Sequence, residues 1–415
     1  MSAQTPILVV SRHFAPSAAV GAKRFSFLTR EFEERGYETH VVTADVDPRD
    51  AVDSSLPRAG SVHRCRPTLR LPVEPTRLGA RYVNRVAKTL LAPLDLDAFW
   101  IRPAARLGAR VVSLAGIRVV IATAPPFSAA LVGKRIAARC RCALVLDYRD
   151  PYSAYPRAHR LRHSTARAIA GRLERMCVDQ SVARVFNTTE MRTQFERVFP
   201  HAPTEAHFVI PNGLPAADLA LAAAGDQPSI LPTIVYAGAV YGDKSLRPVL
   251  RALRELASGE PRFEGVRLAL YGEVPREELA LIGQEGLRHL LDLRPRVSRE
   301  ALWPVLRSSA ALLAIVGRQM GYSIPYKLYD YMAAGRPIIA LGPPESALRR
   351  LFSEAHIGAI ADPADHESIV HALRKQLDPA APGPDRTVVL RHSWDRLAED
   401  YAGVIEYAAS RVSRQ

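Results

Sequence analysis

The chain contains two separate series of short, continuous apolar runs, and each series alternates with amphipathic helical stretches. The first begins with ILVV (Ile7 to Val10) and continues through THVVTA, RVVIATA and CALVLDYRD. The second begins with TIVYAGAV (Thr233 to Val240) and continues through VRLALYGEV, ALLAIV and PIIAL. Apolar runs of this length are typical of strands buried on both faces, and their alternation with helices predicts parallel sheets. We therefore expect two α/β domains.

The length of 415 residues is enough for two domains that each bury their own core. An Ala-rich, polar stretch at 215–228 is the expected linker. We predict an N-terminal domain at 1–215, a C-terminal domain at 228–392, and a terminal helix at 393–415 that returns to the N-terminal domain. Open α/β sheets bind ligands at the carboxyl ends of their strands, so the expected site is a cleft between the two domains.

Two helical segments carry explicit predictions of their buried faces. In RFSFLTREFEERG the helix is expected to end at Gly36 and to bury Phe25, Leu28 and Phe32. A longer basic helix, from about Arg157 to Val182, is expected to bury Leu161, Ile169, Leu173 and Met176.

Composition and charge narrow the possible locations and partners. The net charge is +14, there are four Cys, and there is no apolar run long enough for a transmembrane helix. The N-terminus, MSAQTPILVV, leads directly into a strand and lacks the charged start of a signal peptide. We expect a cytoplasmic protein with reduced cysteines, and an anionic membrane surface at the inner face of the membrane as a possible partner.

The basic residues are spread along the chain, without the aromatic-interleaved motifs of RNA readers, so no nucleic-acid partner is expected. One segment, Thr76 to Leu91, has the pattern of a basic amphipathic helix. It fits a helix that lies on anionic lipid, and it equally fits an ordinary surface helix whose arginines extend to water.

The stretch IPYKLYDYMAAGRPIIALGPPES, from Ile324 to Ser346, predicts a short helix, a tight turn and a buried strand. Leu328 and Met332 share one face of the helix, and Gly335 is the expected stop. Lys327 and Asp330 lie near the helix start. They fit either a ligand site or an i, i+3 surface ion pair.

Five motifs in this order, AVGAKR, DYRDPY, VIPNGL, IVYAGAVYGDKSLRP and IPYKLYDYMAAGRPI, resemble those of the retaining glycosyltransferases of family 4. The resemblance extends over nearly the whole chain. It implies the GT-B fold, which consists of two Rossmann-like, doubly wound α/β domains that face a central cleft. It also implies a nucleotide-sugar donor in the C-terminal domain and an acceptor held mainly by the N-terminal domain.

The resemblance assigns donor-binding roles residue by residue. Lys244 matches a lysine that contacts the donor diphosphate, and Asp330 matches the second acid of the family's Glu-seven-Glu motif, which hydrogen-bonds the ribose. The first acid of that motif, which meets the transferred sugar, falls on Tyr322. A loop and a helix start complete the predicted donor site, through Gly238, Gly242, Ile324 and Lys327.

In the N-terminal domain, DYRDPY places Asp147, Arg149 and Asp150 at the end of a buried strand. Asp147 or Asp150 is a candidate to orient the acceptor hydroxyl beside the reacting carbon. The alternative is structural, with Asp147 and Arg149 in a pair and Asp150 in a turn. Further candidates for contacts with the acceptor are His13, Gly21 and Arg24.

Two Asp-x-Asp sequences, DVD (Asp45 to Asp47) and DLD (Asp95 to Asp97), resemble metal-binding motifs of another glycosyltransferase fold. Neither lies in the expected donor domain, so we predict no required metal or cofactor. The expected activity is transfer of a sugar to a hydroxyl of a glycan, a lipid-linked precursor or a small molecule, with retained configuration. A nucleotide-sugar epimerase and a non-catalytic protein that binds sugar nucleotides are the alternatives.

Overall fold

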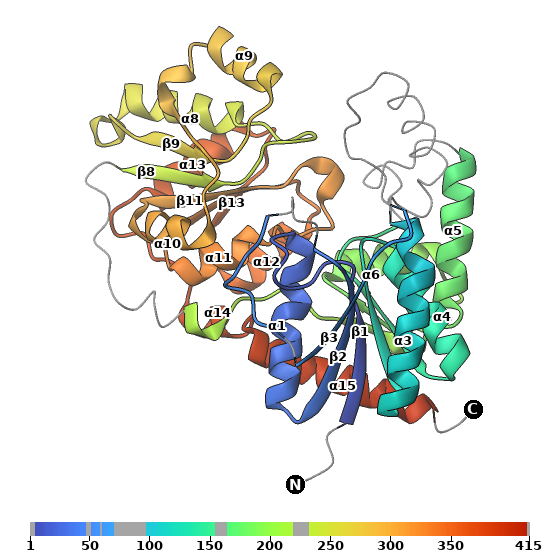
Figure 1. Ribbon diagram of the computed structural model, residues 1–415. Helices are drawn as coiled ribbons and strands as arrows, with labels where there is room; N and C mark the ends of the chain where they lie inside the picture. The colour runs from blue at the N-terminus through green and yellow to red at the C-terminus, as the bar shows by residue number, and fades with distance from the viewer. Residues whose placement is uncertain are drawn as a thin grey trace. The chain divides into compact units, whose positions relative to one another are not determined.

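The computed structural model describes residues 5–46, 51–58, 60–69, 97–153, 164–218 and 232–412. The chain divides into two compact units (Figure 1). Unit 1 contains the chain up to Pro211 together with the segment from Trp394 to the C-terminus, and unit 2 contains Asn212–Ser393. The predicted helix at 76–91 and most of the predicted linker lie outside the described residues.

Unit 1 contains a parallel sheet with the strand order β3-β2-β1-β4-β5-β6-β7. The order reverses direction after β1, so the sheet is doubly wound. Its core strands are fully buried because both faces are covered by helices, as the continuous apolar runs predict. The strands are β1 (Thr5–Val10), β2 (Tyr37–Ala44), β3 (Ser61–Cys65), β4 (Val119–Ala124), β5 (Ala143–Tyr148), β6 (Ala183–Phe186) and β7 (His207–Val209).

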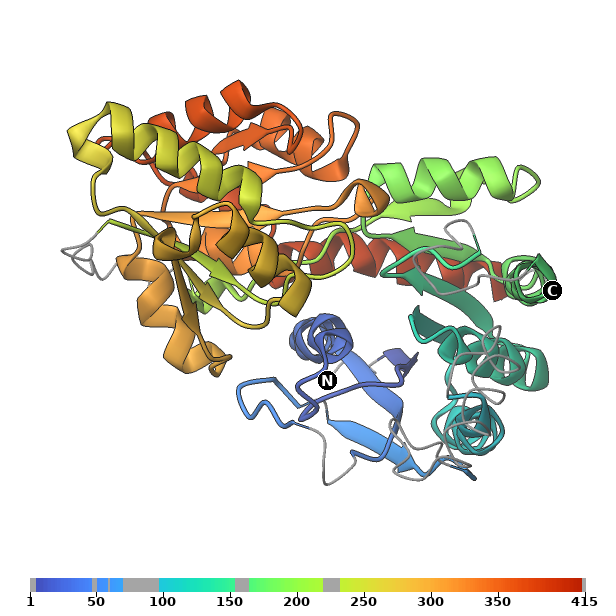
Figure 2. The ribbon, with the colours of Figure 1, turned by 90° about the horizontal axis from the view of Figure 1, so that it is seen from above.

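Helices cover both faces of this sheet. Contacts with the strands place α3 and α4 side by side against β1 to β5, while α15 packs against α1, β4, β5 and β6. Phe27 of α1 stacks on Trp394 of α15 with ring centroids 5.8 Å apart, which joins the two ends of the unit. Figure 2 shows α15, drawn in red, beside the strands of unit 1. The helices are α1 (Val20–Glu34), α3 (Ile101–Ala115), α4 (Ser128–Cys140), α5 (Ser164–Val178), α6 (Thr189–Val198) and α15 (Trp394–Val412).

The two predicted helix faces have different outcomes. In α1 the predicted residues Phe25, Leu28 and Phe32 are all fully buried, so that prediction is confirmed. In α5 the prediction is wrong for Ile169, which is 51% exposed, and for Met176, which is 44% exposed; Leu173 is half-buried, and Leu161 lies outside the described residues. The buried face of α5 instead contains small and polar side chains, namely Ala166, Ala170, Glu174 and Cys177. A buried glutamate on this face is the reason that apolar periodicity selected the wrong side.

Unit 2 contains a second doubly wound parallel sheet, with the order β10-β9-β8-β11-β12-β13. Successive residues of β8 alternate between two hydrophobic clusters. Ile234 and Tyr236 belong to one cluster, and Val235 and Ala237 belong to the other. The strands are β8 (Thr233–Ala237), β9 (Arg267–Tyr271), β10 (Leu291–Arg294), β11 (Ala311–Ile315), β12 (Ile338–Leu341) and β13 (Ala359–Ala361).

One cluster of unit 2 contains residues of α8 and α13, and the other contains residues of α11 and α12. The predicted unit of helix, turn and strand is present, because α11 ends at Gly335, whose φ of 70° is left-handed, and β12 follows. The helices are α8 (Arg247–Gly259), α9 (Arg276–Gln284), α10 (Arg299–Ser308), α11 (Lys327–Ala334), α12 (Ala347–Ala355), α13 (His366–Gln376) and α14 (Arg386–Leu390). None of the helices within the described ranges is long and apolar enough to span a membrane.

Candidate functional site

The carboxyl ends of β8 and β11 mark the point in unit 2 where the strand order reverses, which is where open α/β sheets bind ligands. The loops that follow β8 and β9 touch there, because a Cβ added to Gly272 would overlap the backbone of Gly238. The segment after β11 joins them, since the Gln319 N–H donates to Asp243 Oδ2 over 3.2 Å. Three loops therefore form the carboxyl edge of this sheet.

Two lysines lie in this region without an acidic partner among the described residues. Lys327, the first residue of α11, places its Nζ 3.5 Å from the centroid of the Tyr236 ring. Lys244, in the loop after β8, places its Nζ 3.8 Å from the Tyr241 ring centroid. A Cβ at Gly238 would lie 3.2 Å from Lys327 Nζ, so this lysine sits directly against the β8 loop.

The Nζ of Lys327 is buried and makes no hydrogen bond within the described part of the chain. Burial, together with the nearby charge of Lys244, holds the pKa of Lys327 well below its usual value. A buried, unpartnered ammonium is costly unless an anion is bound to it. The two lysines are thus suited to a ligand with negative charge, and the missing side chain at Gly238 leaves room for the Lys327 ammonium group beside the backbone.

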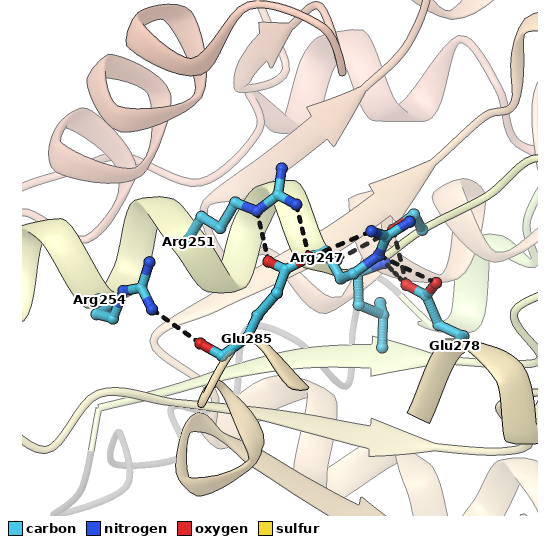
Figure 3. A network of polar contacts seen from close by, with 7 residues as sticks. Arg247, Arg251, Arg254, Glu278 and Glu285 are labelled. Carbon is cyan, nitrogen blue, oxygen red and sulfur yellow. Dashed lines mark hydrogen bonds and ion pairs between the residues drawn. The ribbon is translucent and has the colours of Figure 1, made fainter. Parts of the chain in front are cut away.

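Glu278 of α9 anchors the loop that carries Lys244 (Figure 3). Its Oε1 accepts hydrogen bonds from the Ser245 hydroxyl at 2.7 Å and from the Leu246 N–H at 2.9 Å. Its Oε2 lies 3.4 Å from Arg247 Nε. These contacts fix the residues that directly follow Lys244. The sequence analysis did not identify Glu278, because its partners lie more than thirty residues away in the chain.

Asp330 lies on α11 and pairs with Arg299 of α10. Its Oδ1 accepts from Arg299 Nη2 at 3.0 Å and from Arg299 Nε at 3.2 Å. The same Nη2 donates to Asp218 Oδ2 at 2.5 Å. The predicted alternative, a surface ion pair of Lys327 with Asp330, is not among the ion pairs of the described residues. The second carboxylate oxygen of Asp330 has no hydrogen bond in that part of the chain, so it can still accept one from a ligand.

The remaining residues predicted for the donor site occupy different environments. Tyr322 is only 2% exposed, and its hydroxyl lies 3.3 Å from Met320 Sδ. Ile324 packs against the hydrophobic cluster that contains α11. Gly242 adopts a left-handed φ of 68° in the loop before Lys244. The buried Tyr322 hydroxyl therefore does not face outward as a sugar-binding group would.

In unit 1, Arg24 and Asp147 form a buried ion pair with 2.9 Å between Arg24 Nη2 and Asp147 Oδ2. Asp147 also accepts hydrogen bonds from the hydroxyls of Thr123 and Tyr401. Arg24 donates in addition to the carbonyl oxygens of Ile210 and Pro211. Both side chains are almost completely inaccessible to solvent. The geometry favours the structural interpretation of Asp147, with Arg24 rather than Arg149 as its partner.

Arg149 and Asp150 follow β5 at the carboxyl edge of the first sheet and are half-buried. The Arg149 guanidinium lies against Gly21 in the first turn of α1. Burial raises the pKa of Asp150 to about 6, and the charge of Arg149 partly offsets that rise. Asn187, which follows β6, donates from Nδ2 to the Arg149 carbonyl at 2.8 Å. A carboxyl group that titrates near neutral pH can accept or donate a proton under physiological conditions.

His13 is half-buried in the loop after β1, and its carbonyl accepts from the Ser11 hydroxyl at 2.7 Å. The acids of the two Asp-x-Asp sequences that the structure describes pair with arginines, Asp45 with Arg66 at 2.9 Å and Asp97 with Arg12 at 2.6 Å. The ranges that the structure describes contain no group of three or more His, Cys, Asp or Glu that could hold a metal ion.

One family model matches part of the chain. Residues 231–378, which contain both lysines and Asp330, match the family model described as "Glycosyl transferases group 1". A search of curated proteins found no match to the chain.

Solved structures match over nearly the whole chain. Sucrose-phosphate synthase from Thermosynechococcus elongatus is 14% identical, with a TM-score of 0.64 and coverage of 97% of this chain and 98% of that one. The structure described as "Trehalose-6-phosphate from E. coli bound with UDP-2-fluoro glucose" is 14% identical, with a TM-score of 0.59 and coverage of 99% and 98%. WaaG, a glycosyltransferase involved in lipopolysaccharide biosynthesis, is 14% identical, with a TM-score of 0.53 and coverage of 98% and 99%. Two Rossmann-like, doubly wound units together with these matches show the GT-B fold.

Proposed function

We propose that the protein is a retaining glycosyltransferase that moves a sugar from a nucleotide-sugar to an acceptor hydroxyl. The observation that carries the proposal is the pair Lys244 and Lys327 at the carboxyl edge of the unit 2 sheet, with a buried Nζ that lacks a hydrogen-bond partner among the described residues. Support comes from the family match over the same segment and from the E. coli structure with a bound UDP-sugar analogue.

The chemistry explains why cations are needed there. Transfer breaks the bond between the sugar C1 and the donor phosphate oxygen, and the electron pair leaves with the nucleoside diphosphate. Two ammonium groups stabilise that developing negative charge, above all where burial lowers the effective dielectric constant. The free oxygen of Asp330 can accept a hydrogen bond from a ribose hydroxyl.

In unit 1 we assign contact with the acceptor to the region around Asp150. The acceptor oxygen forms the new bond to C1 on the face from which the diphosphate leaves, which retains the configuration, and it loses its proton, for which Asp150 is the candidate base. Its pKa of about 6 leaves it ionised at neutral pH and able to take up a proton. The proposed acceptor is a hydroxyl of a glycan, a lipid-linked precursor or a small molecule.

The test is an assay of acceptor-dependent release of nucleoside diphosphate with a panel of nucleotide-sugars. Lys244→Ala should raise the donor KM and lower kcat, whereas Lys375→Ala, an exposed lysine of α13 in the same unit, should leave both unchanged. Unchanged kinetics in Lys244→Ala would remove this lysine from the donor site. Conversion of the donor to an epimer without any acceptor would show the epimerase alternative.

Asp330 has a matched control, because Asp218 pairs with the same arginine. Asp330→Asn and Asp218→Asn both weaken the Arg299 ion pairs, but only the first removes a carboxylate from α11. We expect the donor KM to rise in Asp330→Asn well above its value in Asp218→Asn. Equal effects would assign Asp330 a purely structural role.

A second candidate function, a non-catalytic protein that binds sugar nucleotides, is favoured by Tyr322. This residue replaces the family acid that meets the transferred sugar, and its hydroxyl is directed to Met320 Sδ. Donor binding in calorimetry, without turnover in any combination of donor and acceptor, would favour this second function over transfer.

A further inference from the structure

A cavity of about 690 Å³ lies between α3 and α4 of unit 1, and five arginines line it. We call it the arginine groove and define it by Arg102, Arg106, Arg110, Arg135 and Arg139. Two alanines and Ser113 are the other described residues that line it. None of these residues belongs to the candidate site described above.

Helical spacing brings the arginines together. Arg102, Arg106 and Arg110 repeat at i, i+4 and i+8, which places them on one face of α3. Arg135 and Arg139 repeat at i and i+4 on α4. The two helices are in contact and lie side by side in both views (Figures 1 and 2). They pack closely, because a Cβ at position 108 would overlap Ile136 Cδ1 and require that side chain to shift.

No acid of the described ranges pairs with this cluster. The sequence from Ala98 to Leu146, which contains both helices, has no Asp or Glu. Arg135 donates to the Leu131 carbonyl at 3.5 Å, and none of the five forms an ion pair within the described ranges. All five are exposed, and arginines at i, i+4 on one face repel one another.

The plain alternative is a solvated basic surface that helix dipoles help to stabilise. The negative carboxyl end of α4 accounts for Arg139, which lies in its last turn. It does not account for Arg102, because this residue lies in the first turn of α3, where the helix dipole disfavours a cation. It also does not explain why arginines from two helices converge on one cavity.

We propose that the arginine groove binds an anion with two or more phosphate groups. Guanidinium groups match phosphate oxygens in a bidentate manner, and arginine is the residue of choice for such recognition. A helical rise of about 1.5 Å per residue puts Arg102 about 12 Å from Arg110 along α3, which is longer than one phosphate needs. The cavity volume is that of a site for a small ligand.

Two sources can supply this chemistry, a soluble polyphosphate or phosphorylated metabolite, and the phosphates of lipid headgroups. Single-stranded nucleic acid is disfavoured because none of the described residues that line the groove is aromatic, so they offer no platform for base stacking.

The test combines two binding assays with matched variants. In the first, tripolyphosphate is titrated calorimetrically into protein that carries Lys244→Ala and Lys327→Met, so that the candidate donor site does not contribute. In the second, the full chain is sedimented with phosphatidylcholine vesicles with and without phosphatidylglycerol. Each assay compares the unaltered groove with Arg106→Ala/Arg135→Ala and with the control Arg276→Ala/Arg386→Ala, which removes the same charge from exposed positions of unit 2.

We expect the groove variant to bind at least about tenfold more weakly in one assay, while the control stays within about twofold of the parent. Loss in the calorimetric assay identifies a soluble phosphate ligand, and loss only with the anionic vesicles identifies lipid headgroups. Equal losses of affinity in the groove and control variants would show that only the net charge of the protein matters, and this would overturn the proposal. The absence of binding in both assays would also overturn it. Thermal unfolding of each variant verifies that it is folded.

Discussion

Two helices of this protein carry three arginines at nearly the same spacing, yet their surroundings are opposite. On α8, Arg247 and Arg251 bind the carboxylate of Glu285, and Arg254 donates to its backbone carbonyl (Figure 3). On α3, the three arginines of the groove have no acid near them within the described ranges. The spacing is a property of each helix, but the partners come from elsewhere in the chain. Only the folded structure distinguishes cations that hold the protein together from cations left for a ligand.

The same contrast exists in the interior. Arg24 is buried with Asp147 as its counter-charge, whereas the buried Nζ of Lys327 contacts the Tyr236 ring and has no acidic or hydrogen-bonding partner among the described residues. A buried charge with a counter-charge stabilises a fold only while both members are present. A buried cation without one lowers stability and is expected where an anion binds. The predictions below test this division between structural and ligand-binding charges.

The largest effect is expected for Asp147→Asn. The substitution leaves Arg24 buried without its carboxylate, so the free energy of unfolding should fall by about 3–5 kcal/mol. Urea unfolding followed by circular dichroism measures this change. A loss of transfer activity with unchanged stability would contradict the structural role and return Asp147 to the catalytic candidates.

The next largest effect on stability is expected for Glu174, a buried acid with no cation partner among the described residues. Its side chain accepts hydrogen bonds from the Ser153 N–H and hydroxyl. Burial raises its pKa to about 7 from an ordinary value of 4.5. The folded protein therefore holds the proton more tightly than the unfolded chain, and stability should fall by roughly 3 kcal/mol as the pH rises from about 4.5 to about 7.

Glu174→Gln cannot titrate, so its stability should vary less over this pH range. Asp150→Asn is a control, because burial also raises the pKa of Asp150, which acts in the same direction over a narrower pH range. Unfolding in urea at a series of pH values measures both. An unchanged slope in Glu174→Gln would contradict the assignment.

A gain in stability is expected for Lys327→Met. The substitution removes a buried, unpartnered ammonium and keeps most of its apolar volume, so the free energy of unfolding should rise by about 1–3 kcal/mol in the absence of ligand. Differential scanning calorimetry without nucleotide measures this gain. A destabilised Lys327→Met would mean that the lysine has a structural partner in the fold.

The smallest effect on stability is expected for Glu285→Gln. The ion pairs of this residue are partly exposed, so their loss should cost less than about 1 kcal/mol. The same substitution leaves the α8 arginines without their carboxylate, so weak binding of tripolyphosphate should appear in calorimetry. No gain in binding would show that unneutralised arginines on one helix do not suffice, and that the two-helix geometry of the groove matters.

The sequence predicts the sheets well because their strands are continuous apolar runs. The strands β4, β5, β8 and β12 all lie within the runs that predicted them, and β1 begins two residues before its run. It misses β3, β10 and α3. The strands β3 and β10 are short and partly exposed, and α3 has small residues such as Ala104 and Gly108 in the middle of its buried face. The arginine groove was missed for the same reason, because its first three residues lie on α3.

The candidate site was predictable only in part. The motif around Lys327 and Asp330 marks the helix start from local sequence alone. The pairing of Asp330 with Arg299 joins residues 31 apart in the chain, and no local pattern predicts it. Likewise, Asp147 and Asp150 are three residues apart in one motif, but only the structure shows that the first is fully hydrogen-bonded and the second has a raised pKa.

The most direct test of the central claim is calorimetric titration of the protein with uridine, guanosine and adenosine diphosphates. The claim is that cations without an acidic partner bind the ligand. It predicts that one of these nucleotides binds, and that Lys244→Ala and Lys327→Met each abolish most of the affinity. Arg251→Ala, which removes a cation that already has a carboxylate partner, should bind the nucleotide as the parent does. No binding of any diphosphate, or equal affinity in the lysine variants and the parent, would contradict the claim.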